Sequence, residues 1–123
     1  MSHIVTIKTK VTDAAALNDA CRRLGLETPV QGTAKLFSSK ATGLIVKLPG
    51  WTFPAVVDTT SGEVKYDNYN GAWGKQEELD KLLQAYAIER AKSEARRVGH
   101  SVTEQPMSNG SIKLVIQLTG GAA

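Results

Sequence analysis

The chain has 123 residues, of which 41% are hydrophobic, 22% charged and 6% aromatic, and its formal net charge is +3. These proportions are typical of one globular domain and exclude a fibrous chain or one kept disordered by charge. The single Cys21 excludes an internal disulfide and, with few other soft ligands, disfavours a structural zinc site. Because no apolar run approaches the length of a membrane span and the N-terminus resembles a strand, we expect a cytoplasmic protein without membrane contact.

The first part of the chain predicts a strand and then a helix. Residues 3–11 are rich in β-branched side chains and alternate in polarity, as in a strand with one wet face. Thr12 or Asp13 can cap the start of a helix, and Gly25 can end it in a left-handed conformation. Apolar residues recur between them at helical spacing, so we expect a short amphipathic helix over about 13–24.

The middle of the chain predicts three or four antiparallel strands in a meander. Turn-forming glycines and prolines separate its apolar runs, which lie at 34–37, 44–48, 53–57 and 63–66.

A long helix and two strands are expected to follow. An uninterrupted apolar stripe over 75–98, acidic residues in the first turns and Gly99 after the last turn predict the helix. Strands are expected at 100–105 and 111–118, joined through a turn that contains Asn109 and Gly110.

The resulting order is β-α-β-β-β(-β)-α-β-β, which predicts an α+β fold. Two helices with one apolar stripe each should pack on one face of an antiparallel sheet, in a ferredoxin-like plan with an enlarged central meander. Residues 1–119 are expected to form one domain and residues 120–123 a frayed C-terminal tail.

Both ends of the chain resemble one protein family. The opening MSHI, the following TIKT and the stretch LLQAYAIERAKSEARRVGHSVTEQPMSNGSIKLVIQ over 82–117 resemble the family of cyanobacteria and plastid genomes known as hypothetical chloroplast reading frame thirty-five, a domain of unknown function. The likeness covers about half of the chain, and the region from about 28 to 74 departs from the family's pattern. The resemblance implies no activity or cofactor. Family members sometimes lie near genes for AAA-type ATPases, which implies an adaptor role with such a partner.

Aromatic residues cluster in the segment KYDNYNGAWGK, and its glycines leave the backbone free to bend. Aromatic side chains beside amides are typical of a recognition surface, because they supply contact area and adaptable hydrogen bonds. We therefore expect a binding surface made of Tyr66, Asp67, Asn68, Tyr69, Asn70 and Trp73. In the alternative interpretation, Tyr69 and Trp73 cover the sheet as a lid, or Trp73 is a hydrophobic staple at the helix entrance.

Five arginines form a second candidate site, for phosphate groups or nucleic acid, if the two helices lie side by side. They are Arg22, Arg23, Arg90, Arg96 and Arg97. Glu89 and Glu94 interleave with them, so a solvated helix surface of mixed charge explains the pattern equally well.

Chemistry-bearing residues are sparse. His3 and His100 could hold a metal only if their strands were neighbours, and the ligand spacing is poor, so we expect no metal site and no cofactor. Cys21 lies on the apolar stripe of the first helix, where a buried, unreactive thiol is expected. No phosphate loop, nucleophile elbow or metalloprotease motif occurs, which disfavours an enzyme.

Apolar residues occupy both parities in the segments VVD and LIVKL, which indicates strands buried on both sides. A second subunit could cover the sheet face that the helices leave open, or pair with an edge strand, so we expect a homodimer. The sequence thus favours a self-associating, non-enzymatic binding or adaptor module. A protein that binds RNA or phosphate through its basic helix face is the second hypothesis, and a metal-binding or catalytic protein is the third.

Overall fold

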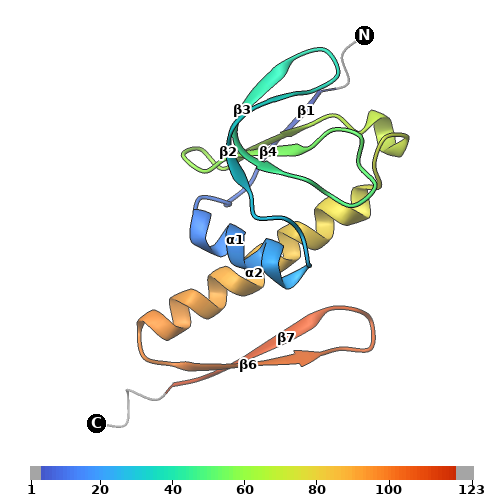
Figure 1. The fold of residues 1–123 in the computed structure, drawn as a ribbon. Helices are drawn as coiled ribbons and strands as arrows, with labels where there is room; N and C mark the ends of the chain where they lie inside the picture. Colours follow the sequence, from blue (N-terminus) through green and yellow to red (C-terminus); the bar gives the residue numbers. More distant parts are fainter. Residues whose placement is uncertain (1–3, 119–123) are drawn as a thin grey trace.

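Residues 4–118 are described by a computed structural model, in which a sheet, a helical layer and a hairpin follow one another in space (Figure 1). The elements are β1 (Val5–Lys8), α1 (Ala14–Arg23), β2 (Val30–Lys35), β3 (Lys40–Val46), β4 (Ala55–Asp58), β5 (Glu63–Tyr66), the short 3-10 helix η1 (Tyr69–Gly71), α2 (Gln76–Arg97), β6 (Ser101–Pro106) and β7 (Ile112–Gln117). The predictions for His3 and for the tail at 120–123 lie outside the described residues.

The main sheet has five antiparallel strands in the order β1-β5-β4-β3-β2. The predicted meander is confirmed, because β2, β3, β4 and β5 pair with their neighbours in sequence. Strand β1 pairs with β5 and occupies one edge, and β2 occupies the other. Strand β2 begins at Val30, earlier than predicted, because its first half has no apolar alternation to reveal it.

Both helices cover the same face of this sheet (Figure 1), as predicted for an α+β fold. The main core joins Leu17 of α1 and Leu82 of α2 to Val57 and Val64 of the central strands, all within 1% exposure. The predicted caps are confirmed. The side chain of Asp13 accepts a hydrogen bond from the Ala16 N–H at 3.1 Å, and Gly25 and Gly99 follow the helices with φ of 72° and 84°.

The opposite face of the sheet is partly covered by the chain itself. The ribbon of β2 and β3 curls over it, and Leu36 and Ala41 bury Val56 of β4, with Ile4 and Phe53 packed around them. Val56 is 2% exposed. The segment VVD predicted a strand buried on both faces, and one chain achieves this by itself. The argument that a second subunit must cover this face is therefore removed.

Strands β6 and β7 form a separate two-stranded sheet, the β6–β7 hairpin. In a ferredoxin-like plan, the strand after the second helix would join the main sheet. Here β6 instead turns back along α2 and contacts that helix, on the side away from the main sheet (Figure 1). None of the helices in the part of the chain that is described combines the length and the apolar character needed to cross a bilayer.

Gly62 joins the end of β1 to the turn between β4 and β5. Its carbonyl accepts the Thr9 N–H at 2.8 Å, its φ is 81°, and a Cβ atom there would lie 2.1 Å from the Thr9 carbonyl oxygen. We expect Gly62→Ala to lower the free energy of unfolding by about 3 kcal/mol, because left-handed strain and overpacking add. Gly50→Ala, which has φ of 74° and open space, should cost only about 1 kcal/mol. Urea unfolding measures both, and equal losses would show that the contact with Thr9 contributes nothing.

Candidate aromatic surface and groove

The loop that follows β5 is the predicted binding surface, and half of it is buried. Tyr66, Asp67 and Asn68 are 6%, 0% and 5% exposed, so these side chains do not form an open surface. Asn68 is structural: its side-chain amide donates to the Gly74 carbonyl at 3.1 Å, and its own carbonyl accepts the N–H groups of Gly71 and Trp73. The prediction that all six side chains form one exposed surface is therefore wrong for these three.

Tyr69, Asn70 and Trp73 complete the loop, and its backbone is strained. Tyr69 and Asn70 have φ of 47° and 52°, in a region that side chains other than glycine rarely adopt, least of all a bulky one. Both residues are exposed. Such strain persists only where the surrounding structure imposes it, and it concentrates at functional sites.

Trp73 lies at the centre of a ring cluster that we call the aromatic surface, made of Phe37, Phe53, Tyr69 and Trp73. Its ring centroid lies 5.0 Å from that of Phe37, 5.7 Å from that of Phe53 and 4.8 Å from that of Tyr69. Phe37 and Tyr69 remain 48% and 43% exposed. Trp73 is thus half-buried against Phe53 of the second core cluster, while Phe37 and Tyr69 keep nearly half of their surface exposed.

Phe37 and Phe53 were not among the predicted site residues. Phe37 follows β2 and Phe53 precedes β4, so both lie far in sequence from the loop that they contact. Phe37 reaches the loop from the turn of the β2–β3 ribbon, and Phe53 reaches it from the connection between β3 and β4. Isolated phenylalanines in a meander are typical of core residues, so no sequence signal singled them out.

Trp51 fixes the loop from its other side. A Cβ atom at Gly74 would lie 2.5 Å from the Trp51 ring, so the ring lies directly against the Gly74 backbone. The Trp51 indole N–H donates to the Lys75 carbonyl at 3.0 Å, and the Thr52 N–H donates to the Trp73 carbonyl at 2.8 Å. These contacts hold the aromatic surface against the start of α2.

The carboxylate of Asp67 is buried beside this surface. One oxygen, Oδ1, accepts the Tyr69 N–H at 3.3 Å, and within the described residues Oδ2 is buried without a hydrogen-bond partner. Because burying an unsatisfied acceptor is costly, Asp67 adds a second local cost to the strain at Tyr69 and Asn70.

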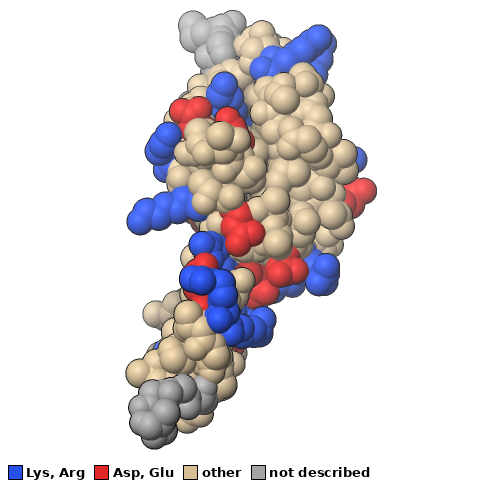
Figure 2. All heavy atoms as spheres, turned by 90° about the vertical axis from the view of Figure 1, so that its left-hand side faces the viewer, with Lys and Arg blue, Asp and Glu red and all other residues tan. Residues whose placement is uncertain are grey.

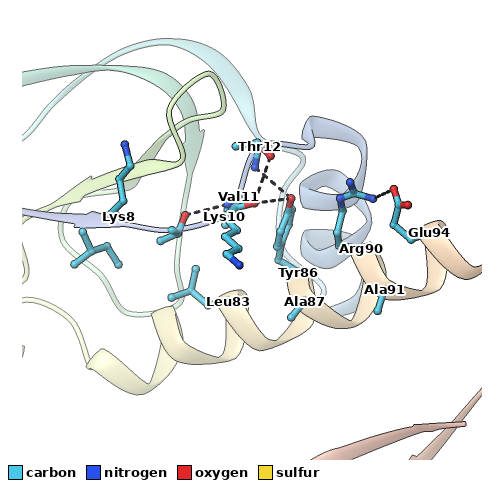
Figure 3. Close-up of a pocket in the computed structure, with 12 residues that line it drawn as sticks. Lys8, Lys10, Val11, Thr12, Leu83, Tyr86, Ala87, Arg90, Ala91 and Glu94 are labelled. Carbon is cyan, nitrogen blue, oxygen red and sulfur yellow. Dashed lines mark hydrogen bonds and ion pairs between the residues drawn. The ribbon is translucent and has the colours of Figure 1, made fainter.

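A groove of about 900 Å³ runs between the end of β1 and one side of α2 (Figure 3). Its lining is mainly apolar and includes Ile7, Leu83, Ala87 and Ala91. The Tyr86 hydroxyl closes one wall, because it donates to the Lys10 carbonyl at 3.2 Å and accepts the N–H groups of Thr12 and Asp13. No feature of the sequence pointed to this groove.

The predicted basic face is largely neutralised. Arg23 of α1 forms a bidentate pair with Glu104 of β6 and also contacts Glu89 at 3.2 Å, and Lys92 contacts Glu104 at 2.6 Å. These four side chains form an ion cluster that ties the β6–β7 hairpin to both helices. Basic and acidic side chains accordingly lie side by side where the lower part of the molecule joins the body (Figure 2).

Of the other four predicted arginines, two pair with Glu94 and two are open to solvent. Arg90 pairs with Glu94, and Arg97 contacts Glu94 at 2.8 Å. Arg22 is 81% exposed and has only a 3.4 Å contact with Asp19. Arg96 is exposed and, among the residues described, has no ion pair. Two open arginines on different helices form a weak phosphate site, since phosphate recognition uses convergent cations.

Metal and thiol chemistry have little support. Strands β1 and β6 belong to different sheets, so the neighbouring strands that a His3–His100 site needs do not occur. Within residues 4–118, no three His, Cys, Asp or Glu side chains lie close enough to hold a metal ion. Cys21 is buried as predicted, and burial raises the pKa of its thiol to about 11, which keeps it protonated.

Comparisons with protein-family models, with curated proteins and with solved structures find no match to this chain.

The ion cluster gives the attachment of the β6–β7 hairpin a defined pH dependence. Hydrogen bonds from Arg23 and then Lys92 lower the pKa of Glu104 from 4.5 to about 2. A depressed carboxyl pKa stabilises the folded state above about pH 4.5, and this contribution disappears as the pH falls toward 2. We expect hydrogen-exchange protection factors of the β6 and β7 amides to fall across that window.

Glu94 also has a pKa lowered to about 2 by hydrogen bonds from Arg97 and Arg90, so it titrates in the same window. Glu104→Gln separates the two: it should reduce hairpin protection already at pH 7 and remove part of the acid-induced fall. Glu77→Gln, at an exposed glutamate of the first turn of α2, is the matched control. Equal behaviour of the two variants would contradict the role of Glu104.

Proposed function

We propose that this protein is a non-enzymatic binding module that contacts a protein partner through its aromatic surface. The observation that carries this proposal is a pair of half-exposed rings, Phe37 in the β2–β3 turn and Tyr69 on a strained loop beside a buried carboxylate. A loop with no role beyond connecting β5 to α2 would not need Tyr in a left-handed conformation, because glycine adopts it without strain.

The chemistry of the surface suits protein recognition. Aromatic side chains offer large contact areas with few rotatable bonds, so little conformational entropy is lost on binding. Trp73 packs the rings against one another, which fixes their positions before a partner arrives. Because the rings form a packed patch, an apolar protein surface fits it better than a small ligand does. The family resemblance makes an AAA-type ATPase one candidate partner.

Tyr69→Gly tests this proposal, because it removes the exposed ring and the backbone strain together. Loss of the contact with Trp73 and relief of the positive φ oppose each other, so the free energy of unfolding should stay within about 1 kcal/mol of the wild-type value. Affinity for the partner should fall by at least about tenfold. Tyr69→Phe, which keeps the ring, should bind like the wild type.

To identify the partner, a photo-crosslinking phenylalanine analogue is placed at position 37 of the protein in its native cell. The control analogue at position 30 replaces Val30, which is 64% exposed but lies outside the aromatic surface. A protein that crosslinks only from position 37 is then purified and titrated against wild type, Tyr69→Gly and Tyr69→Phe. Equal affinity of all three would overturn the role of the aromatic surface.

We further propose that the module self-associates through the β6–β7 hairpin. Of the nine large hydrophobic side chains found exposed in residues 4–118, five lie between residues 98 and 118: Val98, Met107, Val115, Ile116 and Leu118. Val115 and Ile116 are consecutive in β7 and therefore lie on opposite faces of the hairpin. Ile116 shares the face of Glu104, which turns toward the helices, yet it remains 44% exposed, and Val115 on the opposite, mainly polar face is 39% exposed. A second hairpin could cover these exposed side chains.

Light scattering at micromolar concentration measures this directly. We expect a dimer for the wild type and a monomer for the double variant Val115→Thr, Ile116→Thr, which retains β-branched side chains and hence the strand. A monomeric wild-type protein would rule out self-association and leave the aromatic surface untouched.

A further inference from the structure

Within residues 4–118, strand β1 is an edge of the main sheet with no further strand paired to it. The Thr9 N–H bonds to the Gly62 carbonyl at 2.8 Å, and the register places Ile7 opposite Val64 and Lys8 opposite Glu63. Hydrogen-bonded and non-bonded pairs alternate along an antiparallel ladder, so Ile7 and Thr9 point their main-chain groups toward β5. The N–H and C=O groups of Thr6 and Lys8 therefore point outward, where a further strand could pair with them.

The apolar groove continues directly from this edge. Residues 7–12 form one wall, and the opposite wall is the stripe of α2 that includes Leu83, Ala87 and Ala91. The extended part of the first wall is β1, which ends at Lys8, and the chain then turns, with the Thr12 N–H donating to the Lys10 carbonyl at 2.9 Å. Four extended residues span about 13 Å, and the helical stripe from Leu83 to Glu94 spans about 17 Å. A strand of about four or five residues would thus fit between the two walls, with alternate side chains facing α2.

The cations along this edge are open. Lys10 points into the groove over α2, and Lys8 points away from α2 on the other face of β1 (Figure 3). Neither lysine has an ion pair among the described residues, although Lys8 lies opposite Glu63 in the register. Arg90 at the far end is already bound to Glu94. A strand lying here would meet an open positive charge on each of its faces.

We propose that the edge of β1 and the adjoining groove bind an extended acidic peptide segment of a partner protein by strand addition. The main-chain groups of Thr6 and Lys8 pair with the segment, and its apolar side chains lie on Leu83, Ala87 and Ala91. Its carboxylates on the face away from α2 meet Lys8, and a carboxylate at its end on the α2 side meets Lys10. This surface shares no residue with the aromatic surface, so the proposal is independent of the proposed function.

Charge distinguishes this occupant from a second copy of the chain. A second copy could offer its own edge strands β1 and β2, but β1 carries Lys8 and β2 carries Lys35, so either would bring a further positive charge to this edge. The other exposed strands are those of the β6–β7 hairpin. Its charged residues between 101 and 118 are Glu104, which is committed to Arg23 and Lys92, and Lys113, which would bring a further positive charge to Lys8 and Lys10. An acidic segment complements the two lysines, whereas the hairpin does not.

The probe is a fluorescein-labelled peptide of about eight alternating Glu and Val residues, titrated against the full chain and followed by fluorescence anisotropy. We expect saturable binding that weakens when salt is raised from about 50 to about 500 mM, because the lysines are exposed and therefore screened. A Lys–Val peptide of the same length should not bind. A Glu–Val peptide N-methylated at alternate residues along one edge should lose at least about tenfold in affinity, because it cannot complete the ladder.

Two sets of variants locate the site. Lys8→Glu with Lys10→Glu should weaken binding by at least about tenfold, and Ala87→Arg, which fills the groove, should do the same. The control pair Lys35→Glu and Lys113→Glu changes the net charge equally at exposed lysines outside the groove and should retain most of the affinity. Circular dichroism of each variant confirms that it is folded.

Three results of these titrations would overturn the proposal. These are no saturable binding up to about 1 mM peptide, equal binding of the Lys–Val or the N-methylated peptide, or equal weakening by the control pair. A dimer of the wild-type chain that Ala87→Arg alone converts to a monomer would assign the edge to a second copy and would likewise overturn it.

Discussion

The architecture depends on the need to bury both faces of strand β4. Ala55 and Val57 face the helices and Val56 faces the other way, and all three are at most 2% exposed. Two helices can cover only one of these faces, so the β2–β3 ribbon must curl over the other and place Leu36 and Ala41 on Val56. The same curl brings Phe37, in the turn of that ribbon, to Trp73, which Phe53 contacts from the connection between β3 and β4. The aromatic surface is thus a consequence of covering the second face of the sheet.

The loop after β5 holds the aromatic surface in a fixed position. Asp67 and Asn68 turn inward, and Asn68 holds the loop closed through the carbonyl of Gly74. The ring of Trp51 lies on the Gly74 backbone, which has no side chain to keep it away. With both ends of the loop held, the short turn between them is forced through left-handed backbone at Tyr69 and Asn70. The strain at Tyr69 therefore has an identifiable source in the contacts on either side of it.

Local signals in the sequence predicted the local structure well. The caps at Asp13 and Gly99 and the apolar stripes fixed both helices to within about two residues, because capping and periodicity depend on near neighbours. The meander was predictable from its turns for the same reason. The start of β2 was not, since Val30, Gln31 and Gly32 show no alternation. The separate place of the β6–β7 hairpin was also hidden, because it depends on how far α2 extends beyond the sheet and on the pairing of Arg23 with Glu104.

The candidate sites were harder to predict because their chemistry depends on residues far apart in sequence. Tyr69 and Trp73 were found from local composition, but the rings of Phe37 and Phe53 that Trp73 contacts lie in distant connections of the chain. Arg23 and Arg97 look like open cations in the sequence and are neutralised in the structure by Glu104 and Glu94. Lys8 and Lys10 drew no attention in the sequence, yet they have no acidic partner among the described residues.

Strand β1, like α2, adjoins both the aromatic surface and the groove. Ile4, just before it, packs with Phe53 in the second cluster, whereas Ile7 lines the groove beside α2. No side chain of the aromatic surface lines the groove, so a substitution in one surface removes no contact from the other. Two partners could therefore occupy the protein at the same time without sharing a contact residue. That separation fits a module that connects proteins better than it fits an enzyme, whose reacting groups must converge on one point.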